Sequence, residues 1–223
     1  MFAEDIPTYR CQKVAASMLV DGDLDKQPWT LAPRMRLKHA DGSDDSSLVT
    51  AAAALWTDSA LFVAFWCEDP DIRATLMSRD DKVWQEEAVE VFLQPDPRSE
   101  TYFEFQLSPA NVVRDVLVTN PSRTGERCHF DGEWDCDGLT TAVQRRDPGA
   151  CGDAAWDWRT EMSIPFHALG LVNAPRAGDA WRVNVFRIDR YPAVQYLSWS
   201  PTHVSPQPQF HLPARFGTLV FAL

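Results

Sequence analysis

The sequence is short of basic residues and of long apolar runs. Lysine and arginine total 21 against 32 aspartate and glutamate, and the formal net charge is −11 at pH 7. A nucleic-acid or anionic-membrane surface needs a basic face, so we expect neither as a partner. No apolar run approaches the roughly 20 residues that a membrane-spanning helix requires, and we therefore expect no membrane insertion.

The chain also lacks the cysteine and histidine spacings of a zinc site. Its five cysteines form no CxxC pair, and their odd number argues against a dense disulfide framework. Cys128 and Cys136 could bridge a loop, but free thiols are the simpler interpretation. The first 14 residues, MFAEDIPTYRCQKV, contain no apolar signal segment, so the sequence alone predicts a cytoplasmic protein.

No long stretch shows helical periodicity, and we find no internal repeat or interdomain linker. Period-two alternation dominates instead, in short runs separated by Pro, Gly, Asp and Ser. Residues 51–56 and 61–67 flank Thr57-Asp58-Ser59-Ala60 and predict a hairpin whose second strand is covered on both faces. We predict one all-β domain over residues 1–223. Its expected fold is a two-sheet antiparallel β-sandwich of immunoglobulin-like or jelly-roll type, with few short helical turns.

Two successive predicted strands, at 89–93 and 102–108, carry a mixed polar and aromatic face. In both strands alternate residues are apolar and predict a core layer: Val89, Val91, Leu93, Phe103, Phe105 and Leu107. The opposite parity places Glu90 on the same side as Gln106. Trp84 precedes the first strand among polar neighbours, which favours an exposed ring. The sequence thus predicts a surface with one indole, one carboxylate and one amide.

Such a surface suits a sugar. A pyranose ring presents C–H groups on its faces and hydroxyls around its edge, so an indole matches the faces and Glu or Gln accepts bonds from the edge. Nine tryptophans are more than core packing usually needs. We assign four of them, Trp56, Trp66, Trp158 and Trp181, to the core or to sheet packing.

An ordered series of short motifs resembles family 9 carbohydrate-binding modules, in particular the bacterial family 9-like group. The motifs are VDGDLD at 20–25 with Trp29, LWTD at 55–58, LFVAF at 61–65, CEDPD at 67–71, RDD at 79–81, Trp84 with VEVFL at 89–93, EMSIPF at 161–166, GDAWRVN at 178–184, WSP at 199–201 and FG at 216–217. The series covers nearly the whole chain in the right order. The resemblance implies a β-sandwich that binds a mono-, oligo- or polysaccharide without cutting it.

Matched by motif, the family's ligand-binding positions correspond to five residues here. The stacking ring matches Trp84, and the carboxylate six residues later matches Glu90. The amide-bearing strand matches Gln106 with Ser108, and the late-strand amide matches Asn184. Where the family has a second stacking indole this chain has Arg187, for which an ion pair, with Glu90 for example, is the simpler role. The resemblance also suggests a secreted or periplasmic protein.

We expect no required cofactor, although a structural calcium ion could be held by the acidic segments DGDLD, EDPD or RDD. A glycosidase would need paired carboxylates among Glu87, Glu90 and Glu104. Glu87 has the wrong parity to share a face with Glu90, and glutamates on an open sheet face should be too exposed for a raised pKa. We therefore predict no enzymatic activity.

Two alternatives stay open. Related sandwiches carry haem through Met and His ligands, for which the residues Met77, Met162, His203 and His211 are available. The chain could also be a protein-interaction domain that has lost sugar binding.

Overall fold

The structure is a computed structural model that describes residues 6–15, 18–43, 48–146, 156–191 and 193–223. These residues form fourteen strands and four short 3-10 helices, with no α-helix among them. The 3-10 helices are η1 (Trp29–Leu31), η2 (Val83–Gln85), η3 (Phe166–Leu169) and η4 (Pro213–Arg215). The strands are β1 (Thr8–Lys13), β2 (Met35–Arg36), β3 (Lys38–His39), β4 (Thr50–Trp56), β5 (Ala60–Cys67), β6 (Ala88–Gln94), β7 (Thr101–Leu107), β8 (Val113–Thr119), β9 (His129–Asp131), β10 (Thr140–Arg145), β11 (Trp158–Pro165), β12 (Ala180–Asp189), β13 (Gln195–Ser198) and β14 (Gly217–Ala222).

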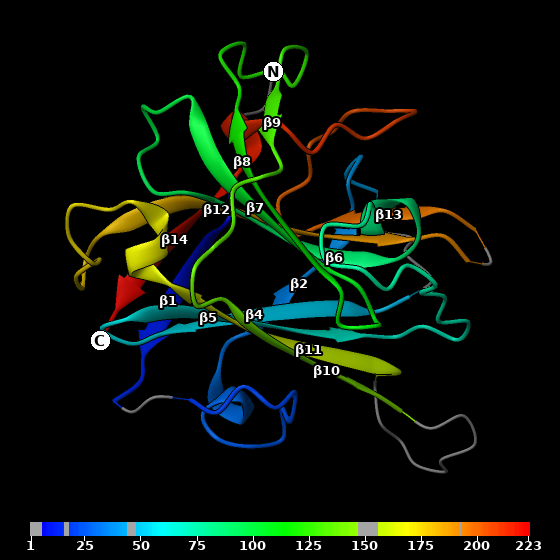
Figure 1. The fold of residues 1–223 in the computed structure, drawn as a ribbon, viewed down its shortest axis with the longest axis horizontal. Helices are drawn as coiled ribbons and strands as arrows, with labels where there is room; N and C mark the ends of the chain where they lie inside the picture. Colours follow the sequence, from blue (N-terminus) through cyan, green and yellow to red (C-terminus); the bar gives the residue numbers. More distant parts are fainter. Residues whose placement is uncertain (1–5, 16–17, 44–47, 147–155, 192) are drawn as a thin grey trace.

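The strands stack in two layers, which confirms the predicted β-sandwich (Figure 1). One layer has the order β10-β11-β5-β4, and we call it the lower layer. The other has the order β14-β12-β6-β7-β8-β9, and we call it the upper layer. One feature departs from the predicted antiparallel pattern. Strand β1 pairs in parallel with both β14 and β4, because it runs along the edges of the two layers and satisfies their open backbone groups.

The predicted hairpin is present as β4 and β5, paired antiparallel from Thr50↔Cys67 to Trp56↔Leu61. Every residue of β5 is buried, as expected for a strand covered on both faces. Its inner face contacts the core between the layers, and its outer face packs under a segment that contains Leu24 and Trp29. The continuous apolar sequence of this strand follows from that double coverage.

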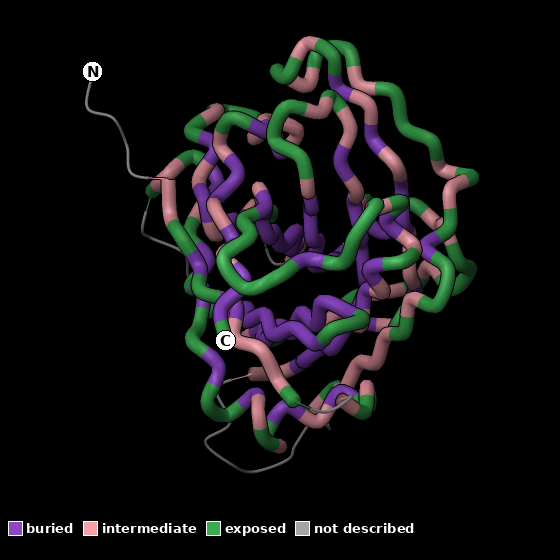
Figure 2. The backbone as a smooth tube through the Cα atoms, turned by 90° about the vertical axis from the view of Figure 1, so that its left-hand side faces the viewer, coloured by how far each residue is buried: buried purple, intermediate pink, exposed green. Residues whose placement is uncertain are grey.

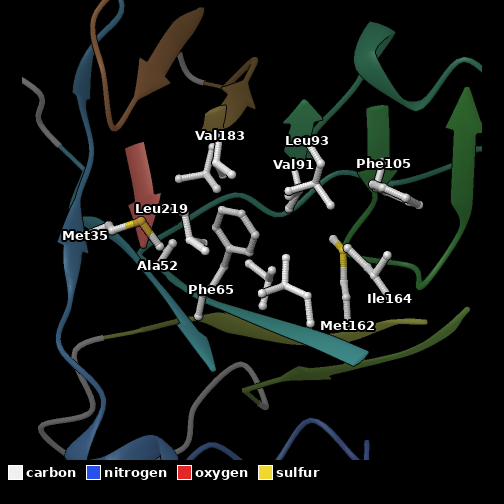
Figure 3. Packing of buried hydrophobic residues seen from close by; sticks show 14 of the residues in the cluster. Met35, Ala52, Phe65, Val91, Leu93, Phe105, Met162, Ile164, Val183 and Leu219 are labelled. Atoms are coloured by element: carbon white, nitrogen blue, oxygen red, sulfur yellow. The ribbon is translucent and has the colours of Figure 1, made fainter. Parts of the chain in front are cut away.

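The main core lies between the two layers. Figure 3 shows Phe65 and Met162 of the lower layer pointing toward Val91, Phe105 and Val183 of the upper layer. Figure 2 shows the buried residues concentrated in the stacked strands and the exposed ones in the connections. The predicted core face of β6 and β7 is thus confirmed, and the residues of opposite parity lie on the outer face of the upper layer.

That outer face is covered over part of its area. Phe92, Tyr102 and Phe186 on the strands form a second apolar cluster with Phe210 and Phe216, which come from the chain after β13. We call residues 199–216 the covering segment. Because this segment covers only part of the face, the polar residues of β6, β7 and β8 lie in the floor of a depression.

Several smaller expectations can be checked against the described residues. Trp56, Trp66, Trp158 and Trp181 are all buried, as predicted. Four cysteines are free thiols (Cys11, Cys67, Cys128 and Cys136), which rules out the Cys128–Cys136 bridge; Cys151 lies outside the described residues. None of the described helices has the length and apolar composition of a membrane-spanning segment.

Candidate functional site

A pocket of about 480 Å³ opens on the outer face of the upper layer. This volume lies within the usual range of small-molecule sites, roughly 300–1,000 Å³. Its floor comes from β6, β7 and β8, and one wall comes from η2. The opposite wall comes from β13 and the covering segment. The lining therefore has two parts. Alternation of residue types in the sequence predicts the strands of the floor, but it does not predict the path of the covering segment.

Three polar side chains stand side by side in the floor because of strand register. Glu90 on β6 is paired with Gln106 on β7, and Gln106 is paired with Arg114 on β8. Glu104 lies two residues before Gln106 and therefore points to the same side. The Gln106 amide Nε2 donates to Glu90 Oε1 at 3.2 Å and to Glu104 Oε1 at 2.5 Å. One amide group thus holds the two carboxyl groups in place.

The two carboxyl groups are deeply buried, which corrects the expectation that they would be exposed. Glu90 is 2% and Glu104 4% exposed, because the covering segment and η2 enclose the sheet face. Burial, and then the neighbouring Glu104 charge, raise the pKa of Glu90 well above its usual value. Burial also raises the pKa of Glu104 to about 7, against the lowering effects of the Gln106 hydrogen bond and the Arg114 charge.

Trp84 lies in η2 at the rim of this floor. Its half-buried ring lines the pocket, and the Arg114 guanidinium lies 5.0 Å from the ring centroid. Its carbonyl oxygen accepts a hydrogen bond of 2.7 Å from Arg190 Nη2, which fixes η2 to the residue after β12. The structure therefore brings Trp84, Glu90 and Gln106, three of the five predicted site residues, into one pocket.

The opposite wall is built by Tyr196, Phe210 and His211. His211 Nδ1 shares a 2.7 Å hydrogen bond with the Tyr102 hydroxyl, and its backbone carbonyl accepts one of 3.0 Å from Asn120 Nδ2. These bonds fix the covering segment to β7 and to the end of β8. Burial lowers the pKa of His211 to about 4, so the ring is uncharged at neutral pH.

Three buried polar atoms of the pocket residues have no hydrogen-bond partner within the described part of the chain. They are Glu104 Oε2, Gln106 Oε1 and Arg190 Nε. Buried polar atoms of a folded protein are almost always satisfied, so each such exception calls for an explanation. Two acceptors and one donor at the same pocket favour a polar ligand with several hydroxyl groups.

Two of the predicted site residues, Asn184 and Arg187, do not line this pocket. Asn184 Nδ2 donates to the Ser200 carbonyl at 2.9 Å and Oδ1 accepts from the Ser200 N–H at 3.0 Å, so Asn184 anchors the covering segment. Arg187 has the parity of Val183 and Val185 and points between the layers, with no exposed surface. It pairs there with Asp69 at 3.1 Å and Asp189 at 2.6 Å, and not with Glu90. Ser108 Oγ accepts from two backbone N–H groups of its own turn.

Arg114, Arg190 and the covering segment belong to the pocket but were not predicted from the sequence. A signal existed for Arg114, because pairing of the strand after Leu107 places it opposite Gln106. Arg190 and the residues around His211 have no such signal, since they reach the pocket through contacts between segments distant in the sequence.

The acidic segments that could bind calcium are mostly neutralised by cations. Asp23 and Asp25 pair with Arg159, and Asp21 pairs with Lys26. Among the described residues, one group has three carboxylate oxygens close together, from Asp80, Asp115 and Asp135. Arg79 already contacts all three carboxylates, at 2.5 Å (Asp115), 2.7 Å (Asp135) and 3.6 Å (Asp80). A calcium ion there stays a proposal, because it would have to compete with this guanidinium.

Comparisons with known proteins bear on the family and the fold. Residues 49–221 match the family model described as Carbohydrate-binding family 9. An "Extracellular protein" of Arthroderma benhamiae (strain ATCC MYA-4681 / CBS 112371) is 30% identical over 151 residues, and the match spans 64% of each chain, less than two thirds of the relative's length.

Solved structures share the fold over nearly the whole chain. A candidate carbohydrate-binding protein from Bacteroides uniformis ATCC 8492 has a TM-score of 0.76 at 19% identity, covering 97% of this chain and 100% of its own. A family 9 module from Caldicellulosiruptor kristjanssonii in complex with cellotriose has a TM-score of 0.64 at 14% identity, covering 96% and 93%. The complex with glucose has a TM-score of 0.61 at 15% identity, covering 95% of each chain.

Proposed function

The chain belongs to carbohydrate-binding family 9, and from this membership and the pocket we propose that it binds a saccharide without cleaving it. The ligand would lie against Trp84 and hydrogen-bond to Glu90, Glu104 and Gln106. The observation that carries the proposal is the set of unpartnered acceptors, Glu104 Oε2 and Gln106 Oε1, buried at the floor of a pocket with an indole at its rim.

The chemistry of recognition follows from the lining. Sugar hydroxyls donate to the free acceptors of the floor, Glu104 Oε2 and Gln106 Oε1. The C–H face of the pyranose ring covers the exposed part of the Trp84 ring. Both sugar and pocket must lose water first, so we expect weak to moderate affinity. Tyr196 and Phe210 line the same pocket, so aromatic surface is present although Arg187 stands at the family's second indole position.

A non-catalytic role is favoured by the arrangement of the carboxyl groups. Glycosidases place the scissile bond between two carboxyl groups, about 5–9.5 Å apart. Here the space between Glu90 and Glu104 holds the Gln106 amide, which bonds to both. Glu87 lies on the other side of the sheet, where its Oε2 accepts from the Arg73 N–H at 3.0 Å. We expect no hydrolysis of aryl glycosides, and hydrolysis that disappears in Glu90→Gln would contradict this.

Haem binding is less well supported by the geometry. Met162 lies in the core between the layers, whereas His211 lines the outer pocket and is hydrogen-bonded to Tyr102. Met77 is 70% exposed, and His203 Nδ1 contacts the Asp41 carbonyl. These residues offer no ready pair of axial ligands, and a colourless purified protein would remove this alternative.

The central test is the variant Trp84→Ala. We expect it to weaken sugar binding by about tenfold or more, because the stacking ring is lost, while the half-buried position limits the loss of stability. Isothermal titration with glucose and cellotriose, the ligands of the solved relatives, measures the affinity, and thermal unfolding measures the stability.

Trp156→Ala is the matched control. That ring is also half-buried, but it packs against the lower layer with the Arg159 guanidinium 4.4 Å from its centroid. Its loss should leave sugar binding unchanged. A collapse of the melting temperature in Trp84→Ala would show that Trp84 is a core residue and that the site is misplaced. Equal binding by wild type and Trp84→Ala would reject the proposal.

A further inference from the structure

The pocket combines a hydroxyl-binding floor with a cationic rim, in a chain of net charge −11. Three of its lining residues are cations: Lys82, Arg114 and Arg190. The titratable groups facing them are the buried pair Glu90 and Glu104 and the uncharged ring of His211. Burial raises the pKa of both glutamates, so they are partly protonated at neutral pH. Together they therefore contribute less negative charge than two fully ionised carboxylates would. A site with excess positive charge is unexpected on so acidic a protein.

The two rim arginines are held by neutral groups rather than by carboxylates. Arg114 Nη1 donates to the Asp80 carbonyl at 2.9 Å, and its guanidinium lies near the Trp84 ring. Arg190 donates to the Tyr196 hydroxyl at 3.1 Å and to the Trp84 carbonyl at 2.7 Å, and its Nε has no partner within the described residues. Within those same residues, neither arginine forms a direct ion pair. Neutral partners fix the guanidinium groups in position but do not cancel their charge.

Other arginines of the molecule are treated differently. Arg79 contacts Asp115 and Asp135, Arg159 contacts Asp23 and Asp25, and Arg187 contacts Asp69 and Asp189. Each of these three cations therefore has at least two carboxylate partners. Arg114 and Arg190 have no such direct carboxylate contact within the described residues, and both flank Trp84 at the pocket rim.

From this arrangement we propose that the pocket prefers a saccharide whose bound unit is a hexuronic acid, with its carboxylate against Arg114 and Arg190. This inference rests on the proposed function and specifies its ligand class. The hydroxyls of the uronic acid donate to Gln106 Oε1 and Glu104 Oε2 at the floor. Its carboxylate accepts from the guanidinium groups, whose planar N–H donors match a carboxylate better than a single-point ammonium does.

The test compares each uronic acid with its neutral counterpart. Titration calorimetry with methyl glucuronoside and methyl galacturonoside, against methyl glucoside and methyl galactoside, should show at least a tenfold preference for one uronic acid over its hexose. That preference should fall severalfold between 20 mM and 500 mM NaCl, because ion pairs at a partly exposed rim are screened. Methyl glucuronamide, a neutral isostere, should bind like the hexose.

Variants assign the preference to the two arginines. Arg114→Gln and Arg190→Gln should each reduce the ratio of uronic acid to hexose affinity by about fivefold or more, and the double variant should bring it close to one. Arg98→Gln is the control, because the Arg98 side chain is exposed and its guanidinium pairs with Asp96 at 2.9 Å, away from the pocket. If a variant does not fold, the wild-type protein still provides a test. The difference between its affinities for methyl glucuronoside and methyl glucuronamide measures the contribution of the carboxylate.

The outcomes separate this inference from the function on which it rests. If hexoses bind and uronic acids bind no more tightly, the uronic acid assignment is wrong and sugar binding stands. If galactose 6-sulfate binds better than galacturonoside, the rim selects a sulfate ester and the carboxylate assignment is wrong. If a folded wild-type protein binds none of these sugars, both proposals fail.

Discussion

Glu90 and Glu104 are acidic side chains that the fold encloses beside one another and bonds to the same amide. A third acidic residue of the same stretch, Glu86, has a different environment, because its carboxylate accepts from the Thr75 N–H at 2.7 Å in an exposed loop. Enclosure of an ionisable group costs free energy whenever the charged form is present in the folded state. The enclosed glutamates therefore lower the stability of the folded protein when they are charged.

This cost should appear as a pH dependence that Glu90→Gln removes. The folded-state pKa values of Glu90 and Glu104 are raised above the unfolded value near 4.5. Below pH 4.5 both states are protonated, and as pH rises toward the folded-state pKa the unfolded state loses its protons first. Stability is therefore lost with rising pH, and the Gln variant should gain on the order of 1–3 kcal/mol relative to wild type between pH 4.5 and pH 8.

Urea unfolding at pH 4.5, 6 and 8 measures this difference directly. Glu133→Gln, at an exposed position, is the control and should show a small effect at every pH. A Glu90→Gln effect of the same size at all three pH values would mean that the raised pKa of Glu90 plays no part in stability.

At the scale of elements, Arg187 joins the two layers. It lies on β12 of the upper layer, and its Nη1 donates to Thr50 Oγ1 on β4 at 2.9 Å and to the Glu68 carbonyl after β5 at 2.6 Å. Its Nη2 contacts Asp69 and Asp189, and both of these carboxylates are buried. A single cation thus compensates two carboxylates inside the sandwich.

Arg187→Met should destabilise the protein strongly and leave the pocket chemistry intact. Removing one partner of a buried ion pair leaves uncompensated charge, which typically costs about 3–5 kcal/mol. Arg98→Met removes an exposed pair that solvent screens, and it should have little effect on stability. Thermal unfolding compares the two variants. Calorimetry at a temperature where Arg187→Met is folded should find unchanged sugar affinity, and a selective loss of affinity there would return Arg187 to the binding site.

Alternation of residue types was sufficient to predict β4 to β7 and the side of the sheet on which Glu90 and Gln106 lie. Parity is a local property of a strand, so it needs no knowledge of the neighbours. The burial of Glu90 and the exclusion of Asn184 were not predictable in this way. Both depend on the covering segment, whose path is set by contacts such as Asn184 with Ser200 and His211 with Tyr102.

Arg187 was assigned to the outer face of the sheet, but its side chain points between the two layers. Position in a motif placed it where relatives of the family carry an indole, whereas its parity with Val183 and Val185 points to the core. Parity was the better guide, because neighbouring positions on one strand must alternate between faces.

At the scale of the whole molecule, β1 makes the two layers one structural unit. Residues Thr8 to Gln12 pair with β14 of the upper layer, and Gln12 and Lys13 pair with β4 of the lower layer. The Tyr9 hydroxyl adds a hydrogen bond to the Pro33 carbonyl at 2.9 Å and accepts one from the Ala54 N–H at 3.0 Å. Arg187 and the shared core add further links, so we propose that residues 6–223 unfold as a single domain.

A ligand bound on the upper layer should therefore stabilise the lower layer equally. At a free sugar concentration of about 100 times Kd, binding to the folded state alone adds about 2.7 kcal/mol to the free energy of unfolding. Hydrogen exchange followed by mass spectrometry should show this gain in the slowest amides of β4, β5 and β11 as well as in those of β6 and β7, because these amides exchange through global unfolding. Trp84→Ala with the same sugar should show no gain in either layer. A gain confined to β6, β7 and β8 would mean that the upper layer opens on its own, and that the contacts made by β1 and Arg187 do not couple the two layers into one domain.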